Sequence, residues 1–149
     1  MRQWTCALVL LLCGCGGTQS SSTTVKGQEV DIVMTAGIWD GTYEGVESGR
    51  KGTIHFELVQ GYGVTEGKVV MNAGDPTKAV PLSIKFIDIG KGTIQGKLAP
   101  YTDPQCNCQV ETEFIGRRQG NVVSGTFTTT MVGTNKTQRG TWQAQRVKK

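Results

Sequence analysis

The chain has 149 residues, with 16 Lys and Arg against 12 Asp and Glu and a formal net charge of +4. This length provides one domain with a hydrophobic core and is too short for two such domains. The chain contains 21 Gly and no long stretch with an apolar period of 3.6 residues, so we expect an all-β fold.

The N-terminal segment has the features of an export signal. Arg2 precedes an apolar run over residues 4–12, which is about half of the roughly 20 residues that a membrane-spanning helix needs. A run of this length is typical of a signal-peptide core, which is removed from the mature protein. We expect residues 1–14 to be a signal peptide, 15–36 to be an anchored cysteine with a flexible tether, and 37–149 to be the folded domain.

Leu12-Cys13-Gly14-Cys15 resembles the lipobox of bacterial lipoproteins, with a branched residue three positions before a cysteine and a small residue directly before it. The resemblance implies that Cys15 carries a diacylglyceryl group, that the chain is cut just before it, and that the new amine is acylated. Several acyl chains anchor a protein without a transmembrane helix, because each buried CH₂ contributes about 0.8 kcal/mol. Gly16, directly after the cysteine, resembles signals sent to the outer membrane. The alternative is an ordinary secretory signal that contains cysteines.

A short phrase of glycine, a polar residue and a large apolar residue recurs along the rest of the chain. It begins at Gly41, Gly52, Gly67, Gly92, Gly96, Gly125 and Gly140. The first and third residues of the phrase face the same side of a strand, so we expect the glycine and its apolar partner to point inward. Inward glycines permit the sharp coiling and close packing of a small closed barrel.

Alternating apolar and polar residues, separated by turn signals rich in Gly, Asn, Asp and Pro, predict eight strands. They span residues 37–45, 52–60, 64–72, 79–88, 92–100, 106–117, 121–132 and 137–147. Their short connections favour an up-and-down antiparallel order. Eight strands close into a barrel just wide enough for side chains or one small ligand. We therefore expect an all-β protein with a small up-and-down antiparallel eight-stranded β-barrel.

Gly37-Ile38-Trp39 resembles the G-x-W opening of the first strand in calycins, the lipocalin and avidin-like barrels. Those barrels carry an Arg or Lys on the last strand that packs over the tryptophan and closes one end. Arg146 stands at the corresponding place, in phase with Trp142 and Ala144. The resemblance implies a calycin-like barrel closed by Trp39 and Arg146. It names no ligand, since the chain lacks other lipocalin landmarks and any biotin-contacting pattern.

Cys106 and Cys108 remain once the signal is removed and Cys15 is acylated. An exported protein enters an oxidising compartment, and Pro104 just upstream favours the local bend that a bridge across one residue needs. We therefore expect a disulfide between Cys106 and Cys108. A soft-metal site or a thiol-redox role is the alternative, but zinc needs about four ligands and the one histidine, His55, falls at a water-facing position.

Three aromatic residues, Trp39, Tyr43 and Trp142, are the candidates to line a ligand pocket. In a barrel this small, the alternative is that they form its plug and core. The chain contains no nucleophile elbow, phosphate loop or His-based triad, and the acids within its strands fall at water-facing positions. We therefore expect no enzyme activity, no cofactor and no bound metal.

Two classes of function agree with these features. The first, which we favour, is a lipoprotein of the bacterial cell envelope, anchored through Cys15 at the outer membrane and acting through its surface, as a structural component, by contact with another envelope protein, or by inhibiting a foreign hydrolase. The second is calycin-like binding of a small apolar or amphipathic ligand. We expect no nucleic-acid partner for an exported chain.

Two acids and seven bases lie from Glu111 onward, and this basic region is either solvated surface or a contact for acidic headgroups or glycans.

Overall fold

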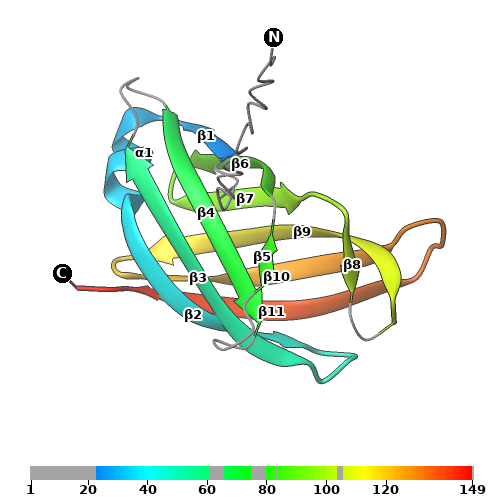
Figure 1. Cartoon of the computed structure of the whole chain (residues 1–149). Helices are drawn as coiled ribbons and strands as arrows, with labels where there is room; N and C mark the ends of the chain where they lie inside the picture. The colour runs from blue at the N-terminus through cyan, green and yellow to red at the C-terminus, as the bar shows by residue number, and fades with distance from the viewer. Residues whose placement is uncertain (1–22, 61–65, 75–79, 83, 104–105, 149) are drawn as a thin grey trace, which may run out of the picture.

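Strands lie at each of the eight places that the alternation of apolar and polar residues predicted (Figure 1). A computed structural model of the chain describes residues 23–60, 66–74, 80–82, 84–103 and 106–148. The described strands with six residues or more are β2 (Gly37–Gly45), β3 (Lys51–Gln60), β4 (Glu66–Gly74), β6 (Ile84–Gly90), β7 (Thr93–Leu98), β9 (Cys108–Gln119), β10 (Val122–Met131) and β11 (Thr137–Arg146). The shorter elements are β1 (Thr23–Gly27), α1 (Glu29–Thr35), β5 (Val80–Leu82) and β8 (Tyr101–Asp103).

The eight long strands follow the order β6-β7-β9-β10-β11-β2-β3-β4, and every neighbouring pair is antiparallel. β5 extends this order by pairing with β4, and β8 pairs with β9. β1 pairs in parallel with β6 and antiparallel with β4. Figure 1 shows that the resulting sheet curls strongly around a common interior. The fold is therefore mostly β, with one strongly curled mixed sheet.

The expected closed, up-and-down barrel is wrong in one place, between β4 and β6. Consecutive strands of a simple meander would pair there, but β5 pairs with β4 at three positions, and β6 pairs with β1 and β7. β1 joins the two edges near one end only, through four residue pairs with β4 and three with β6. The sheet is thus an open half-barrel, and the parallel β1–β6 pair makes it mixed.

Residues 23–36 belong to the folded domain, although the sequence pattern predicted a flexible tether over 15–36. Val25 and Ile32 are buried in the interior, and α1 contacts β1, β3, β4 and β6. The signal is weak here because β1 has five residues, and because the seven residues of α1 place apolar side chains on both faces. Among the described residues, no helix has the length and apolar character needed to cross a membrane. The expected signal peptide and Cys15 lie outside the described part of the chain.

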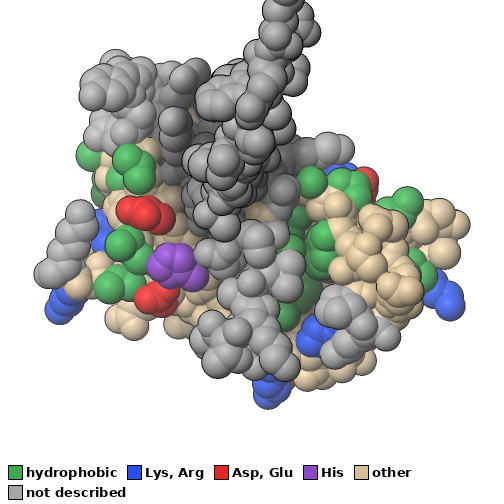
Figure 2. Space-filling model, in the orientation of Figure 1, with side chains coloured by type: hydrophobic (Ala, Val, Ile, Leu, Met, Phe, Trp, Pro, Cys, Tyr) green, Lys and Arg blue, Asp and Glu red, His purple; other side chains and the backbone are tan. Residues whose placement is uncertain are grey.

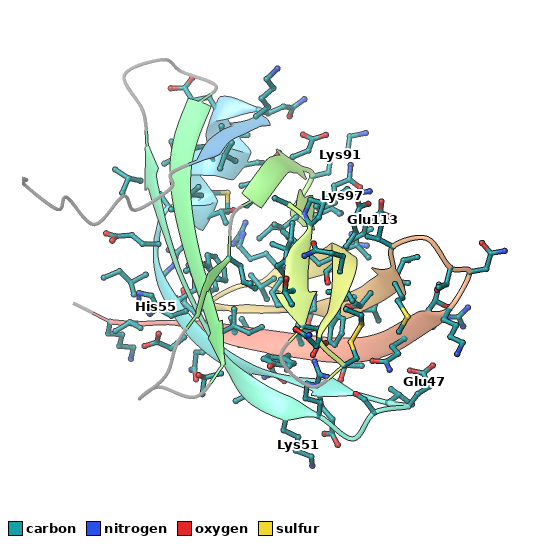
Figure 3. The ribbon with its side chains drawn as sticks, turned by 45° about the vertical axis from the view of Figure 1, so that its right-hand side comes forward. Glu47, Lys51, His55, Lys91, Lys97 and Glu113 are labelled. Atoms are coloured by element: carbon teal, nitrogen blue, oxygen red, sulfur yellow. A yellow bond between two sulfur atoms is a disulfide. The ribbon has the colours of Figure 1, made fainter. Side chains whose placement is uncertain are left out.

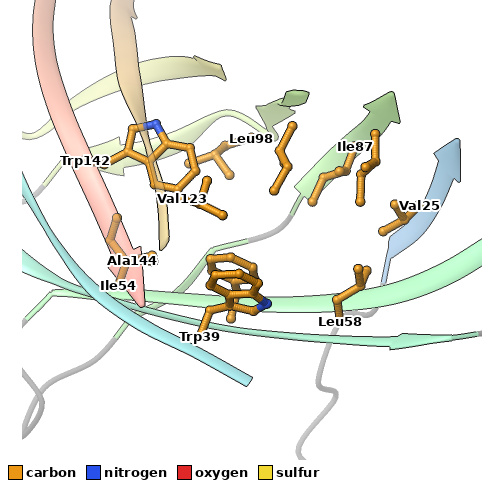
Figure 4. Packing of buried hydrophobic residues seen from close by; sticks show 12 residues of the cluster. Val25, Trp39, Ile54, Leu58, Ile87, Leu98, Val123, Trp142 and Ala144 are labelled. Atoms are coloured by element: carbon orange, nitrogen blue, oxygen red, sulfur yellow. The ribbon is translucent and has the colours of Figure 1, made fainter. Parts of the chain in front are cut away.

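The inner face of the curled sheet carries the hydrophobic core (Figure 4). The core cluster consists of Val25, Trp39, Ile54, Phe56, Leu58, Ile87, Ile89, Ile94, Leu98, Val123, Trp142 and Ala144. Trp39 stacks on Phe56 with ring centroids 5.8 Å apart, and Phe114 meets Trp142 edge to face at 6.1 Å. Aromatic pairs in these arrangements add to the stabilisation that burial provides, and they tie β2 to β3 and β9 to β11.

Inward glycines make room for the aromatic rings. A Cβ atom on Gly116 would lie 2.4 Å from the Trp142 ring, and one on Gly140 would lie 2.2 Å from the Phe127 ring. Both distances are shorter than any ordinary contact of a Cβ atom, so a larger residue at either position would displace an aromatic side chain. Gly140 begins one of the repeated glycine phrases, and its role in the fold is to leave space for a ring on the neighbouring strand.

Candidate functional site

α1 lies across the end of the half-barrel where β2 begins and β11 ends, and we call this the α1 end (Figure 1). Asp31, Ile32 and Thr35 form the buried face of the helix. The Asp31 carboxylate accepts hydrogen bonds from the backbone N–H groups of Lys91 (2.8 Å) and Gly92 (3.1 Å). These two residues have φ angles of 53° and 74°, as in the two-residue type I′ turn of a hairpin. Asp31 therefore fixes the first turn of α1 to the β6–β7 turn.

The C-terminal end of α1 is held by the two residues that the sequence singled out as the closure pair. Trp39 donates from Nε1 to the Thr35 carbonyl at 2.8 Å, and Arg146 donates from Nη2 to the Met34 carbonyl. The last carbonyl groups of a helix have no partner within the helix and carry partial negative charge, so an N–H donor and a cation suit them. The Arg146 guanidinium carbon also lies 4.8 Å from the centroid of the Trp39 ring, a distance typical of cation–π contacts.

The outer face of α1 is apolar and exposed. Val30, Val33 and Met34 follow the i, i+3, i+4 spacing of one helix face, and they are 58%, 46% and 47% exposed. Arg118 lies beside this face, with its Nη2 atom 3.6 Å from the Met34 sulfur. Because α1 is held at both ends, it cannot turn this face toward the interior. The apolar face of α1, defined by Val30, Val33 and Met34, is therefore a fixed feature of the surface.

The strands that end beside α1 bring positive charge to the same place. Arg117 and Arg118 lie at the end of β9, and Arg146 and Lys148 lie at and just beyond the end of β11. The described chain contains no Asp or Glu over residues 114–148. Apolar side chains on a helix with cations at its edge are the combination found on surfaces that meet lipid headgroups or acidic partners.

Among the described residues, the core side chains leave little space for a ligand. Trp39 and Trp142, two of the three residues expected to line a pocket, are buried in the core cluster. Tyr43, the third, is half-buried and meets Phe127 edge to face with ring centroids 6.0 Å apart. A cavity of about 20 Å³ lies among Phe56, Ile94, Trp142 and other core residues. This volume suffices for about one water molecule, whereas small-molecule pockets have volumes of about 300–1,000 Å³.

A partly buried ion pair crosses the opposite end of the half-barrel. Arg50 Nη1 lies 2.5 Å from Asp103 Oδ2, and the side chains are 25% and 6% exposed. The hydrogen bond to Asp103 raises the pKa of the Arg50 guanidinium. Burial raises the pKa of the nearby Tyr43 phenol above its usual value of 10.0. The pair connects the turn before β3 with the last residue of β8.

Cys106 and Cys108 form a disulfide in the turn between β8 and β9. Asn107 between them has a φ angle of 50°, and its backbone N–H donates to the Asp103 carbonyl at 2.8 Å. The disulfide turn therefore borders the carboxylate that pairs with Arg50. The arrangement indicates a structural bridge that holds the β8–β9 turn beside this ion pair.

Charged side chains on the outer surface of the sheet form small groups. His55 Nδ1 lies 2.5 Å from Asp40 Oδ1 on the exposed face that Figure 2 shows, with the histidine in purple and acidic side chains in red. Lys97 Nζ lies 2.7 Å from Glu111 Oε2 and 3.2 Å from Glu113 Oε1 (Figure 3). Hydrogen bonds to Glu111 and Glu113 raise the pKa of Lys97. In the part of the chain that the structure describes, no three His, Cys, Asp or Glu side chains gather as metal ligands.

Comparison of the chain with protein-family models, with curated proteins and with solved structures found no match. Only the geometry of the described residues therefore indicates a candidate site.

The structure brings some of the predicted residues together and adds others. Trp39 and Arg146 meet at the α1 end, whereas Tyr43 lies toward the far end, near Arg50 and Asp103. The sequence did not predict the apolar face of α1 or the Asp31 contact, because seven residues are too few to establish a helical period. Val30, Val33 and Met34, which end two residues before the G-x-W motif, are the one feature that could have suggested the apolar face.

Proposed function

We propose that this chain is a lipoprotein of the bacterial cell envelope, anchored through acyl chains on Cys15 at the outer membrane, whose curled β domain acts through its outer surface. In this proposal the domain is a structural or interaction module and performs no catalysis. The anchor is inferred from the lipobox-like residues 12–15 and from the polar stretch that follows them.

The packing of the interior carries the proposal. Core side chains of the described strands occupy the inner face of the sheet, and the cavity among them measures about 20 Å³. A carrier of lipids or other organic molecules needs a much larger space. The surface, in contrast, carries a fixed apolar face on α1 with bases beside it. These features favour a function at the surface over a function in the interior.

Calycin-like binding of a small ligand is the second candidate. The contact between Trp39 and Arg146 favours it, because calycin barrels close one end with this pair of residue types. Such a ligand would have to enter by displacing core side chains or by binding at the far end, near Tyr43 and Arg50. Inhibition of a foreign hydrolase is a special case of the surface function and would use an exposed loop or strand edge.

Native mass spectrometry of the chain purified from its own envelope tests the proposal. We expect a polypeptide that begins at Cys15, with the mass of its acyl chains and no further bound molecule. Cys15→Ser is the control, and it should retain residues 1–14 and carry no acyl mass. Wild-type protein without acyl mass would contradict the anchor. A small molecule released from the purified protein at moderate collision energy would contradict the surface function and support the second candidate.

A further inference from the structure

We propose that the apolar face of α1, together with the bases beside it, docks onto the anionic lipid surface of the membrane that holds the chain. This inference rests on the proposed function, because it assumes that Cys15 is acylated. It assigns a second point of membrane contact and thereby an orientation of the domain, with the α1 end toward the lipid and the Arg50–Asp103 end away from it.

The apolar face of α1 is permanently exposed. Asp31 holds the start of α1 to the β6–β7 turn, while Trp39 and Arg146 hold its last carbonyl groups. A mobile helix could bury its apolar side chains by rotating, but three independent contacts prevent rotation here. Single exposed apolar residues are common on protein surfaces, whereas a fixed cluster of Val30, Val33 and Met34 is typical of a contact surface.

The side chains directly beside the apolar face of α1 carry positive charge. Arg118 contacts the Met34 sulfur, and Arg146 contacts the Met34 carbonyl, so two cations lie directly beside the apolar face. Long basic side chains can keep their charge at the headgroups while neighbouring apolar residues enter the acyl region. Glu29 at the start of α1 and Asp88 on β6 are exposed acids of the same end. Glu57 near the end of β3 is a further exposed acid at this end, whereas the charged residues of β9 and β11 here are all bases, so the preferred contact tilts toward β9 and β11.

The chain between Cys15 and the folded domain is short. Eight peptide units separate Cys15 from Thr23, so the first residue of β1 lies within about 28 Å of the acylated cysteine. β1 then runs toward the α1 end, because Gly27 pairs with Ile89 near the end of β6. A short connection of this kind keeps the domain close to the bilayer, where even a weak lipid contact is favoured by its high effective concentration.

Site-specific fluorescence of the acylated full chain in vesicles tests the orientation. Val33→Cys and Asn135→Cys each introduce one free thiol for an environment-sensitive label, at the α1 end and in the β10–β11 turn at the far end. The vesicles contain either phosphatidylglycerol with phosphatidylcholine or phosphatidylcholine alone, with a quencher placed in the acyl region. We expect quenching at position 33 to exceed quenching at position 135 by about twofold or more in the anionic vesicles.

Because the docking depends on attraction between bases and anionic lipid, we expect this difference to become smaller in neutral vesicles, at high salt and in Arg118→Gln. Equal quenching at positions 33 and 135, in protein that floats with the vesicles, would overturn the docking and leave the anchor intact. Wild-type protein that does not float would contradict the anchor and with it the inference. Shielding of position 33 only after another envelope protein is added would overturn the lipid contact in favour of a protein partner.

Discussion

Arg50 and Asp103 are 53 positions apart in the chain, yet they form the partly buried ion pair at the far end of the half-barrel. No local pattern in the sequence predicts this pair, because the turn at residue 50 contains no information about residue 103. Trp39 and Arg146 are different. The resemblance of Gly37-Ile38-Trp39 to the calycin motif implied a basic partner on the last strand, and alternation put Arg146 in phase with Trp142 on that strand. Trp39 and Arg146 could therefore be singled out from the sequence, whereas the Arg50–Asp103 ion pair could not.

Asp103→Asn retains the shape of the side chain but removes its charge. We expect the free energy of unfolding to fall by about 1–3 kcal/mol, because the variant leaves the Arg50 guanidinium without an ionised partner at the 2.5 Å contact. The expected loss is smaller than for a fully buried pair, since Arg50 is partly solvated. Urea unfolding followed by tryptophan fluorescence measures the change.

Asp88→Asn is the matched control, because Asp88 is an exposed carboxylate on β6. We expect its effect on the free energy of unfolding to stay within about 0.5 kcal/mol. If the two variants lose the same small amount of stability, the ion pair does not contribute to holding the far end together.

At the level of elements, the eight long strands could be predicted because alternation with a period of two residues is a local property of the chain. Their inward glycines could be predicted for the same reason, although the sequence did not show which ring each glycine accommodates. β1 and α1 could not be predicted. β1 depends on partners from β4 and β6, and α1 is a seven-residue helix whose position depends on the contact of Asp31 with the β6–β7 turn and on the contacts with Trp39 and Arg146.

Gly116→Ala tests whether glycines set the packing of the strands. The new methyl group would lie 2.4 Å from the ring of Trp142, which is buried and cannot move aside without disturbing the core. We expect a loss of about 1–3 kcal/mol in the free energy of unfolding, as for overpacked cores in general. A change in the near-ultraviolet circular dichroism of the tryptophans should accompany the loss.

Gly90→Ala provides the comparison within the same sheet, because a Cβ atom there would have no heavy atom within 4 Å. We expect this variant to be as stable as the wild type or slightly more stable, since alanine restricts the unfolded chain. Equal destabilisation at positions 90 and 116 would show that the loss comes from the backbone of the strands and not from the space beneath Trp142.

At the scale of the whole molecule, the sequence did not predict how the edges of β4 and β6 are joined. A simple meander places the third and fourth predicted strands side by side, whereas the fold inserts β1 between β4 and β6 near the α1 end. Local alternation does not determine which distant segment covers an edge, because that pairing is made between residues far apart in the chain. The residues assigned to a tether provide the strand that joins these edges.

The domain should therefore require residues 23–36. We expect a chain that begins at residue 23 to unfold cooperatively, and a chain that begins at residue 37 to lose most of its stability. The shorter chain lacks Val25 and Ile32, both buried, and burial of each such side chain contributes about 1.5–3 kcal/mol. It also exposes the edges of β4 and β6, which favours aggregation. Circular dichroism during thermal unfolding, together with size-exclusion chromatography, measures both effects.

Two single substitutions in the longer chain separate packing from chain length. Ile32→Ala removes a buried side chain of α1 and should cost about 2–5 kcal/mol, whereas Val33→Ala removes its exposed neighbour and should change stability by about 0.5 kcal/mol or less. This contrast follows from the position of α1 over the interior, with one face in the core and the other outside. A fully stable chain beginning at residue 37, or equal effects of the two substitutions, would show that β1 and α1 lie on the domain without supporting it.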